Sequence, residues 1–186
     1  SERMRRNLAI LAPFLVLFAL GGCGGVAVDD YAGETPTLRP ERFFDGRLVA
    51  HGVVKNRAGR VTRRFRAAIE ASWEDGVGTL EEDFVFDDGE EDRRVWTLTP
   101  AGPGRYRGRA GDVVGVADAS VAGNSMFLDY TLRVPLDDST IDLRIDDRMY
   151  LLDRNTLLNE SIMRKFGFRV GEILLVIRRL EGGEAW

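Results

Sequence analysis

From about Leu48 onward, apolar and polar residues alternate along the chain with a period of two. Such alternation is typical of β-strands that have one buried and one solvated face, as in antiparallel sheets. The clearest runs lie at residues 64–73, 126–136 and 141–151. Short stretches rich in Gly, Asp and Asn separate the runs and fit hairpin or short loop connections. The pattern therefore predicts an all-β domain made of consecutive hairpins.

The number and spacing of the runs favour a single closed barrel. Strands at intervals of about 10–15 residues suggest a meander of about eight to ten strands. An open sheet of that size would leave unpaired edges, and closure into an antiparallel β-barrel removes them. A β-sandwich remains the alternative, because it uses the same alternation.

Three segments depart from the simple pattern. Residues 39–44 are expected to form one short helical turn before the first strand. The apolar residues of the segment 156–166 fit neither the strand period nor the helix period well. The segment 173–177 is apolar throughout, which predicts a strand that is covered on both faces.

The N-terminal stretch has the features of an export signal. Met4-Arg5-Arg6 is followed by an apolar run from Leu8 to Leu20. A run of about 13 residues is too short for a membrane-spanning helix, but it fits a secretory signal. The run ends in Leu20-Gly21-Gly22-Cys23, which resembles the lipobox of bacterial lipoproteins, where the cysteine receives a diacylglycerol. An ordinary signal peptide, or a buried apolar segment with a chance cysteine, is the alternative.

These features divide the chain into three parts. We expect a lipoprotein signal peptide at 1–22, a lipidated Cys23 with a flexible tether at 23–40, and the barrel domain at 41–182. Gly24, and not Asp, follows the cysteine, which favours sorting to the outer membrane. The expected location is therefore the outer membrane, with the lipid anchor binding the membrane and the domain facing the periplasm.

Composition excludes several classes of function. The 186 residues carry a net charge of −4, which gives no reason to expect nucleic acid as a partner. One cysteine and one histidine leave no disulfide framework, no cysteine-based zinc site and no site with two imidazoles. Neither a glycine-rich phosphate loop nor a serine elbow is present. The acidic run 87–92 does not have EF-hand spacing and reads as a solvated hairpin tip, so we expect no cofactor and no metal.

Several short motifs occur in a specific order along the chain. They are Phe43-Phe44-Asp45-Gly46, Glu82-Asp83-Phe84 with Asp88-Gly89, Arg94 with Trp96, Asp112-Val113-Val114-Gly115, Gly123-Asn124-Ser125, Asp146-Asp147-Arg148-Met149-Tyr150-Leu151 and Lys165-Phe166-Gly167. Together they resemble a family of proteobacterial lipoproteins known as domain of unknown function 3833, over about residues 36–180. Arg148 stands where the family pattern has an aromatic residue. The resemblance implies an envelope lipoprotein with a lipocalin-like barrel, and it implies no particular activity.

Three charged residues lie among apolar residues on faces that are expected to point inward. Glu82 shares its face with Leu80 and Phe84, Arg94 shares its face with Trp96, and Asp147 lies between Ile145 and Met149. Buried charges must pair, bind a ligand or lose their charge. They form either an internal salt-bridge network or the polar end of an apolar cavity, in which Arg94 would meet a ligand carboxylate.

The 87–92 turn is expected to place Phe84 near Trp96 and Arg94 near Phe86, which leaves Glu82 a long diagonal away from Arg94. The aromatic residues Trp96, Tyr106 and Tyr130, together with Trp73 and Phe84, are also expected to point inward, either as core or as the wall of a ligand site. The candidate ligand-binding residues are Glu82, Arg94, Trp96, Tyr106, Tyr130 and Asp147.

Three functions follow from these expectations. The first is a lipid-anchored binding protein that holds a fatty acid or another apolar ligand in its barrel. The second is a structural or assembly role, in which rows of outward arginines dock on another envelope protein; these are Arg64, Arg66, Arg105, Arg107 and Arg109. The third is a lipid-modifying enzyme that uses Glu82, Asp147 or His51 as general acid or base.

Overall fold

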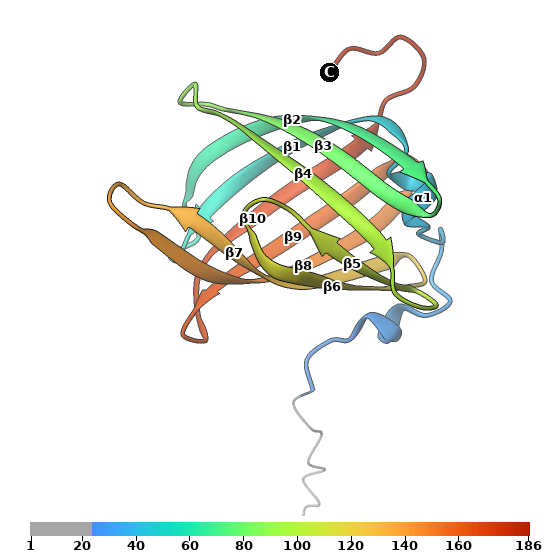
Figure 1. Cartoon of the computed structure of the whole chain (residues 1–186), viewed down its shortest axis with the longest axis horizontal. Coiled ribbons are helices and arrows are strands. Elements are labelled where there is room, and N and C mark those ends of the chain that lie inside the picture. The colour runs from blue at the N-terminus through green and yellow to red at the C-terminus, as the bar shows by residue number, and fades with distance from the viewer. Residues whose placement is uncertain (1–23) are drawn as a thin grey trace, which may run out of the picture.

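The computed structural model describes residues 24–186, which form a closed barrel of ten antiparallel strands (Figure 1). The strands are β1 (Gly46–Asn56), β2 (Val61–Glu74), β3 (Val77–Phe86), β4 (Glu91–Pro100), β5 (Arg105–Arg109), β6 (Val113–Ala122), β7 (Ser125–Pro135), β8 (Thr140–Asp153), β9 (Thr156–Lys165) and β10 (Phe168–Arg179). Each strand pairs with the next strand in the chain, as a meander requires.

Pairing of the first strand with the last closes the sheet. Ala50 on β1 lies opposite Ile177 on β10, and also opposite Ala67 on β2. Every strand among residues 24–186 therefore has a partner on both sides, which limits the tendency of strand edges to bind other chains. β5 is short, however, and pairs with β4 only over Thr97–Pro100, so residues 91–96 of β4 are paired on one side only. This arrangement confirms the predicted barrel and excludes the β-sandwich.

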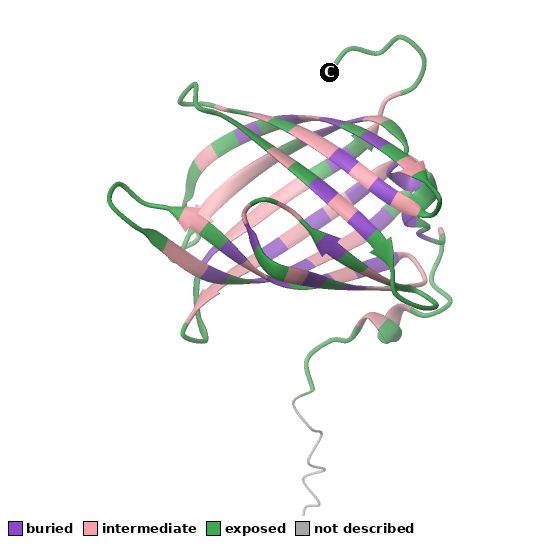
Figure 2. Cartoon of the chain, in the orientation of Figure 1, coloured by how far each residue is buried: buried purple, intermediate pink, exposed green. Residues whose placement is uncertain are grey.

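Buried residues recur between more exposed ones along the strands (Figure 2). The buried residues are mostly apolar, and they form the inside of the barrel. On β2, for example, Ala67, Ile69 and Ala71 are buried, while Arg66 and Glu70 between them are exposed. The prediction for 173–177 was only half right. Ile173 and Ile177 point into the barrel, but the side chain of Val176 is 40% exposed on the outer face, because nothing covers that face there.

A short helix closes one end of the barrel, which we call the helix end. This helix, α1 (Pro40–Phe43), confirms the helical turn expected before the first strand. Phe43, Phe44 and Leu38 are almost fully buried there. The indole Nε1 of Trp73 donates a hydrogen bond of 2.7 Å to the carbonyl oxygen of Phe44, which fixes the segment against β2.

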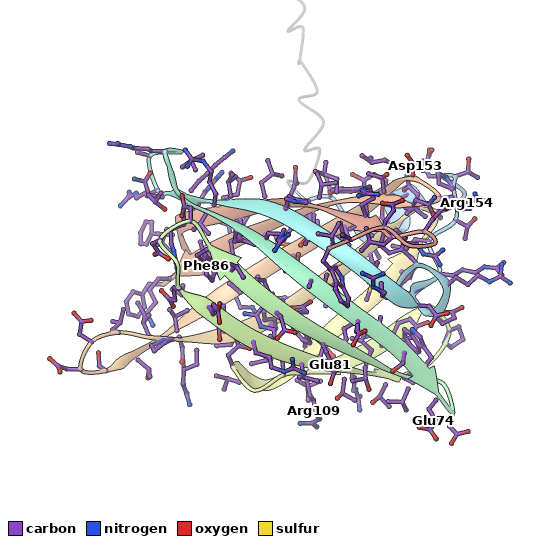
Figure 3. The ribbon with its side chains drawn as sticks, turned by 90° about the horizontal axis from the view of Figure 1, so that it is seen from above. Glu74, Glu81, Phe86, Arg109, Asp153 and Arg154 are labelled. Carbon is purple, nitrogen blue, oxygen red and sulfur yellow. The ribbon has the colours of Figure 1, made fainter. Side chains whose placement is uncertain are left out.

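The opposite end, which we call the far end, is formed by the hairpin loops between β1 and β2, β3 and β4, β7 and β8, and β9 and β10. Figure 3 shows the separation, because Phe86 lies at one end while Glu74, Asp153 and Arg154 lie at the other. No helix of the described part of the chain covers the far end. The two ends of the barrel therefore differ in how they are closed.

The stretch that precedes α1 is not wholly a free tether. A single turn of 3₁₀ helix, η1 (Val28–Tyr31), contacts β6 and β7. The ring of Tyr31 lies 5.9 Å from that of Phe127 and 5.4 Å from that of Tyr150. These aromatic contacts hold part of the 23–40 stretch on the outside of the barrel, where we expected a flexible linker.

The predicted signal peptide at 1–22 and the predicted lipid attachment site, Cys23, lie outside the described residues. Within 24–186, neither helix is long and apolar enough to cross a membrane.

We predict that Phe44→Ala lowers the free energy of unfolding by about 3–5 kcal/mol, because it removes a buried ring from the helix end and leaves a cavity. Phe166→Ala is the matched control, since the Phe166 side chain is 86% exposed and its loss is expected to cost less than about 0.5 kcal/mol. Denaturant unfolding of both variants measures the difference. Equal losses in the two variants would contradict the role of Phe44 in closing this end.

Candidate functional site

The barrel encloses a cavity of about 130 Å³. Most of its wall is apolar and comes from many strands, with Ile69, Leu128 and Leu175 among the contributors. Phe44 forms its floor at the helix end. Five polar side chains also face the cavity: Glu82, Arg94, Asp147, Asn159 and Ser161. The site therefore combines an apolar chamber with one polar cluster, as ligand pockets commonly do.

The pairing of β3 with β4 places Glu82 directly opposite Arg94. Our expectation that the two lie a long diagonal apart was wrong, because the register is shifted by four residues and the partner of Arg94 is Glu82 instead of Phe86. The turn is tighter than expected, because the amide N–H of Phe86 already bonds the carbonyl oxygen of Glu90. Asp88 accepts the amide N–H of Glu90, so the acidic residues that follow belong to β4 and not to the loop.

Arg94 is held mainly by Asp112, a residue that the sequence analysis placed in a family motif but not among the candidate binding residues. Nε and Nη2 of Arg94 donate to the Asp112 carboxylate at 2.6–3.0 Å, in a two-pronged arrangement. β5 ends at Arg109, and the loop that follows brings Asp112 to Arg94. The carbonyl oxygen of Asp112 accepts the amide N–H of Arg133 on β7, which fixes the loop.

The charge of Arg94 is stable despite its surroundings. Burial acts against the charged form, but the hydrogen bonds to Asp112 and the attraction of Glu82 hold the pKa of Arg94 above its ordinary value. Nη1 of Arg94 lies 4.0 Å from a carboxylate oxygen of Glu82, so that pair is an ion pair without a short hydrogen bond. The guanidinium also lies 5.7 Å from the centre of the Phe84 ring.

Asp147 is only 5% exposed and is surrounded by donors. It accepts hydrogen bonds from the Tyr130 hydroxyl at 3.4 Å, from the Ser161 hydroxyl at 3.0 Å and from the side-chain amide of Asn159. Burial raises the pKa of Asp147, although these three bonds and the attraction of Arg94 act in the opposite direction. Burial also raises the pKa of Tyr130 well above its usual range, so this hydroxyl stays protonated.

Glu82 has the fewest partners of the polar cluster, since the 4.0 Å ion pair with Arg94 is, within the described chain, its one charged contact at close range. Its side chain is 15% exposed, and among residues 24–186 its carboxyl group makes this ion pair but no hydrogen bond. Burial raises its pKa to about 7; attraction by Arg94 acts against this shift, and the nearby Asp147 and Asp112 add to it. Near neutral pH this group can therefore either donate or accept a hydrogen bond from something in the cavity.

The structure separates the aromatic candidates into two groups. Trp96 and Tyr130 line the cavity, with their rings edge to face at 5.4 Å. Tyr106 does not line it, because its hydroxyl bonds Glu41 at 3.0 Å and its ring packs on Trp73 at the helix end. The ligand-binding role expected of Tyr106 is therefore replaced by a role in holding α1 in place.

Asn159 and Ser161 were also missed, although their positions carried a signal. They lie on β9 at the same alternate positions as the buried Leu157, so they must point inward once the segment is a strand. His51, in contrast, lies outside the cavity. It is exposed on the outer face of β1, while its neighbour Ala50 lines the cavity, so His51 cannot act on a ligand inside. Within 24–186, no group of three metal-ligating side chains comes together.

Comparison with known proteins identifies the family. The family described as protein of unknown function, DUF3833, matches residues 17–179. The chain belongs to this family. Comparison with curated proteins gives no significant match. Membership of this family assigns the protein no activity.

The protein is similar in fold to several solved structures. The S-type phycobiliprotein lyase CPES from Guillardia theta is 12% identical, with a TM-score of 0.58 over 78% of this chain and 94% of that one. A protein with unknown function from the DUF3598 family of Nostoc punctiforme is 16% identical, with a TM-score of 0.57 over 84% of this chain and 53% of that one. Rv2717c from M. tuberculosis is 17% identical, with a TM-score of 0.53 over 80% and 99%. At such identities the likeness concerns the fold alone, which is a lipocalin-like barrel.

Glu82 makes the free energy of unfolding of the protein depend on pH. Its pKa is about 7 in the folded chain and 4.5 without the fold, so its stabilising contribution is complete below pH 4.5 and is lost as pH rises through 7. The shift corresponds to roughly 3 kcal/mol. We predict that Glu82→Gln removes most of this loss, so that the unfolding free energy of the variant changes less between pH 5 and pH 8 than that of the wild type.

Urea unfolding at the two pH values measures the effect. Glu81→Gln is the control, because Glu81 lies on the outer side of β3 beside Arg93. If Glu82→Gln and wild type lose equal stability between pH 5 and pH 8, Glu82 does not titrate in this range.

Proposed function

We propose that the protein is a lipid-anchored envelope protein that binds an apolar ligand inside its barrel. The observation that carries this proposal is the apolar cavity, closed at the helix end, with a free carboxyl group in its wall. A barrel that served only as a scaffold would gain stability by filling this space, because an unfilled cavity and buried charges both cost free energy. Retention of both is typical of binding sites.

The size of the cavity indicates how much of a ligand fits. An engineered cavity of about 150 Å³ holds one benzene molecule, so about 130 Å³ accommodates a small ring or a short segment of an acyl chain. A longer acyl chain would extend toward the far end. An acyl lipid therefore fits better than a large polycyclic ligand.

The proposed location rests on the sequence of the N-terminal stretch. The motif Leu20-Gly21-Gly22-Cys23 supports lipidation at Cys23, and Gly24 supports sorting to the outer membrane with the barrel in the periplasm. Two or more acyl chains would make such anchoring stable.

One surface feature favours a second role, in assembly. The outward arginines of β5 (Arg105, Arg107 and Arg109) are exposed, and none of them makes a salt bridge to another residue of 24–186. In contrast, Arg64 pairs with Asp87. The β5 row could dock on an acidic envelope partner.

Native mass spectrometry of the full chain, extracted from bacterial envelopes in mild detergent, tests ligand binding. We expect an added mass on the wild type that solvent extraction recovers as an acyl lipid. Ala50→Phe, which fills the cavity from β1, should lose the added mass, and Val176→Phe on the outer face should keep it. If Ala50→Phe does not fold, the smaller Ala50→Leu serves in its place. The proposal would be overturned if the wild type carries no added mass and gains none after envelope lipids are added.

The anchor has its own test. Cys23→Ala removes the thiol that would receive the diacylglycerol, so the protein should no longer appear in the washed membrane fraction and should lack the mass of the acyl groups. Immunoblots of fractionated cells measure this. Membrane association that survives the substitution would contradict a lipid anchor at Cys23.

A further inference from the structure

We propose that the cavity selects an apolar chain that ends in a hydrogen-bond-donating head group, such as an alcohol or an amine, and rejects a free fatty acid carboxylate. This proposal deepens the proposed function and rests on it. It also differs from the expectation that Arg94 would bind a ligand carboxylate. Three features of the polar cluster carry it.

The first feature is that the guanidinium of Arg94 is already engaged. Asp112 occupies Nε and Nη2, the two positions that would grip a carboxylate with two parallel bonds. The remaining Nη1 faces Glu82. A ligand carboxylate would have to displace Asp112, whose loop is held to β7 through the amide N–H of Arg133.

The second feature is the balance of charge around the cavity. Three carboxyl groups, those of Glu82, Asp112 and Asp147, surround one guanidinium. Each of them disfavours another negative charge nearby, since like charges in a poorly solvated site repel strongly. A neutral or positive head group meets no such penalty.

The third feature is which hydrogen-bonding capacity is left unused. Asp147 already accepts from Tyr130, Asn159 and Ser161, so it offers little to a ligand. Glu82 has no such partner within the described chain. When Glu82 is ionised its oxygens can only accept, so the ligand must bring the hydrogen. A carboxylate brings none and would leave two unpaired acceptors facing each other.

The test compares three ligands with the same chain and different heads. Octanol, octylamine and octanoate are titrated calorimetrically at pH 8 into the full chain in mild detergent, and Ala50→Phe supplies the background from partition into detergent. We expect octanol and octylamine to bind, and octanoate to bind at least about tenfold more weakly. Octanoate binding as tight as that of the other two would overturn the inference while supporting the proposed function. Failure of all three to exceed the background would overturn both.

Two variants test the residues named. Asp112→Asn should free the guanidinium of Arg94, so octanoate affinity rises by about tenfold or more. Glu82→Gln should lower the affinity for octylamine by a similar factor, because it removes the negative charge of the group that accepts the ligand's hydrogen bond. Asp83→Asn is the matched control, since Asp83 accepts a hydrogen bond from Arg93 on the outer face. This variant should bind octanoate and octylamine with unchanged affinity. Unchanged octanoate affinity in Asp112→Asn would show that Arg94 is not what excludes carboxylates.

Discussion

A sheet of ten strands that closes on itself encloses more space than its own side chains readily fill. Eight strands already give an interior that is just wide enough for packed side chains, and the diameter grows with each strand added. The protein responds differently at its two ends. At the helix end, α1 and Phe44 fill the barrel and are tied to it through Trp73 and Tyr106. Toward the middle, the space stays open as the apolar cavity.

The polar cluster shows how charges are accommodated inside such a barrel. Arg94 and Asp112 neutralise one another through short bonds, and Asp147 is supplied with three donors. Both arrangements follow the requirement that buried polar groups be satisfied. Glu82 is satisfied least, because in the described residues it has only the 4.0 Å ion pair with Arg94 and burial raises its pKa to about 7. A carboxyl group without a hydrogen-bond partner at the wall of a cavity is where binding energy for a ligand would be realised.

Much of the fold could be predicted because a period of two decides both strand and face at once. The inward positions of Glu82, Arg94 and Asp147 followed from it. The register of β3 with β4 and the partner of Arg94 were not predicted, because the alternation of apolar and polar residues does not determine them. The register of β3 with β4 is set by the tight turn at Asp88, and the match of Asp112 to Arg94 depends on a loop path across the end of β5.

The segment 156–166 could not be assigned to a strand or a helix from its apolar residues, and the reason is a different one. Asn159 and Ser161 occupy inward positions that a purely structural strand would fill with apolar residues, so the apolar alternation breaks there. The break exists because Asp147 on the neighbouring strand needs donors. Tyr106 shows the reverse error, since its inward position was correct but the space it reaches belongs to the helix end.

Pairing of β1 with β10 has a consequence for how the chain reaches this state. Contacts between the first and last strands have the greatest separation in sequence, and such contacts form late because a long loop must first be ordered. During synthesis, β1 therefore keeps one edge unpaired until β10 has emerged. In that interval the incomplete sheet exposes both its edge and its apolar inner face, and surfaces of this kind make a partly folded chain prone to aggregation.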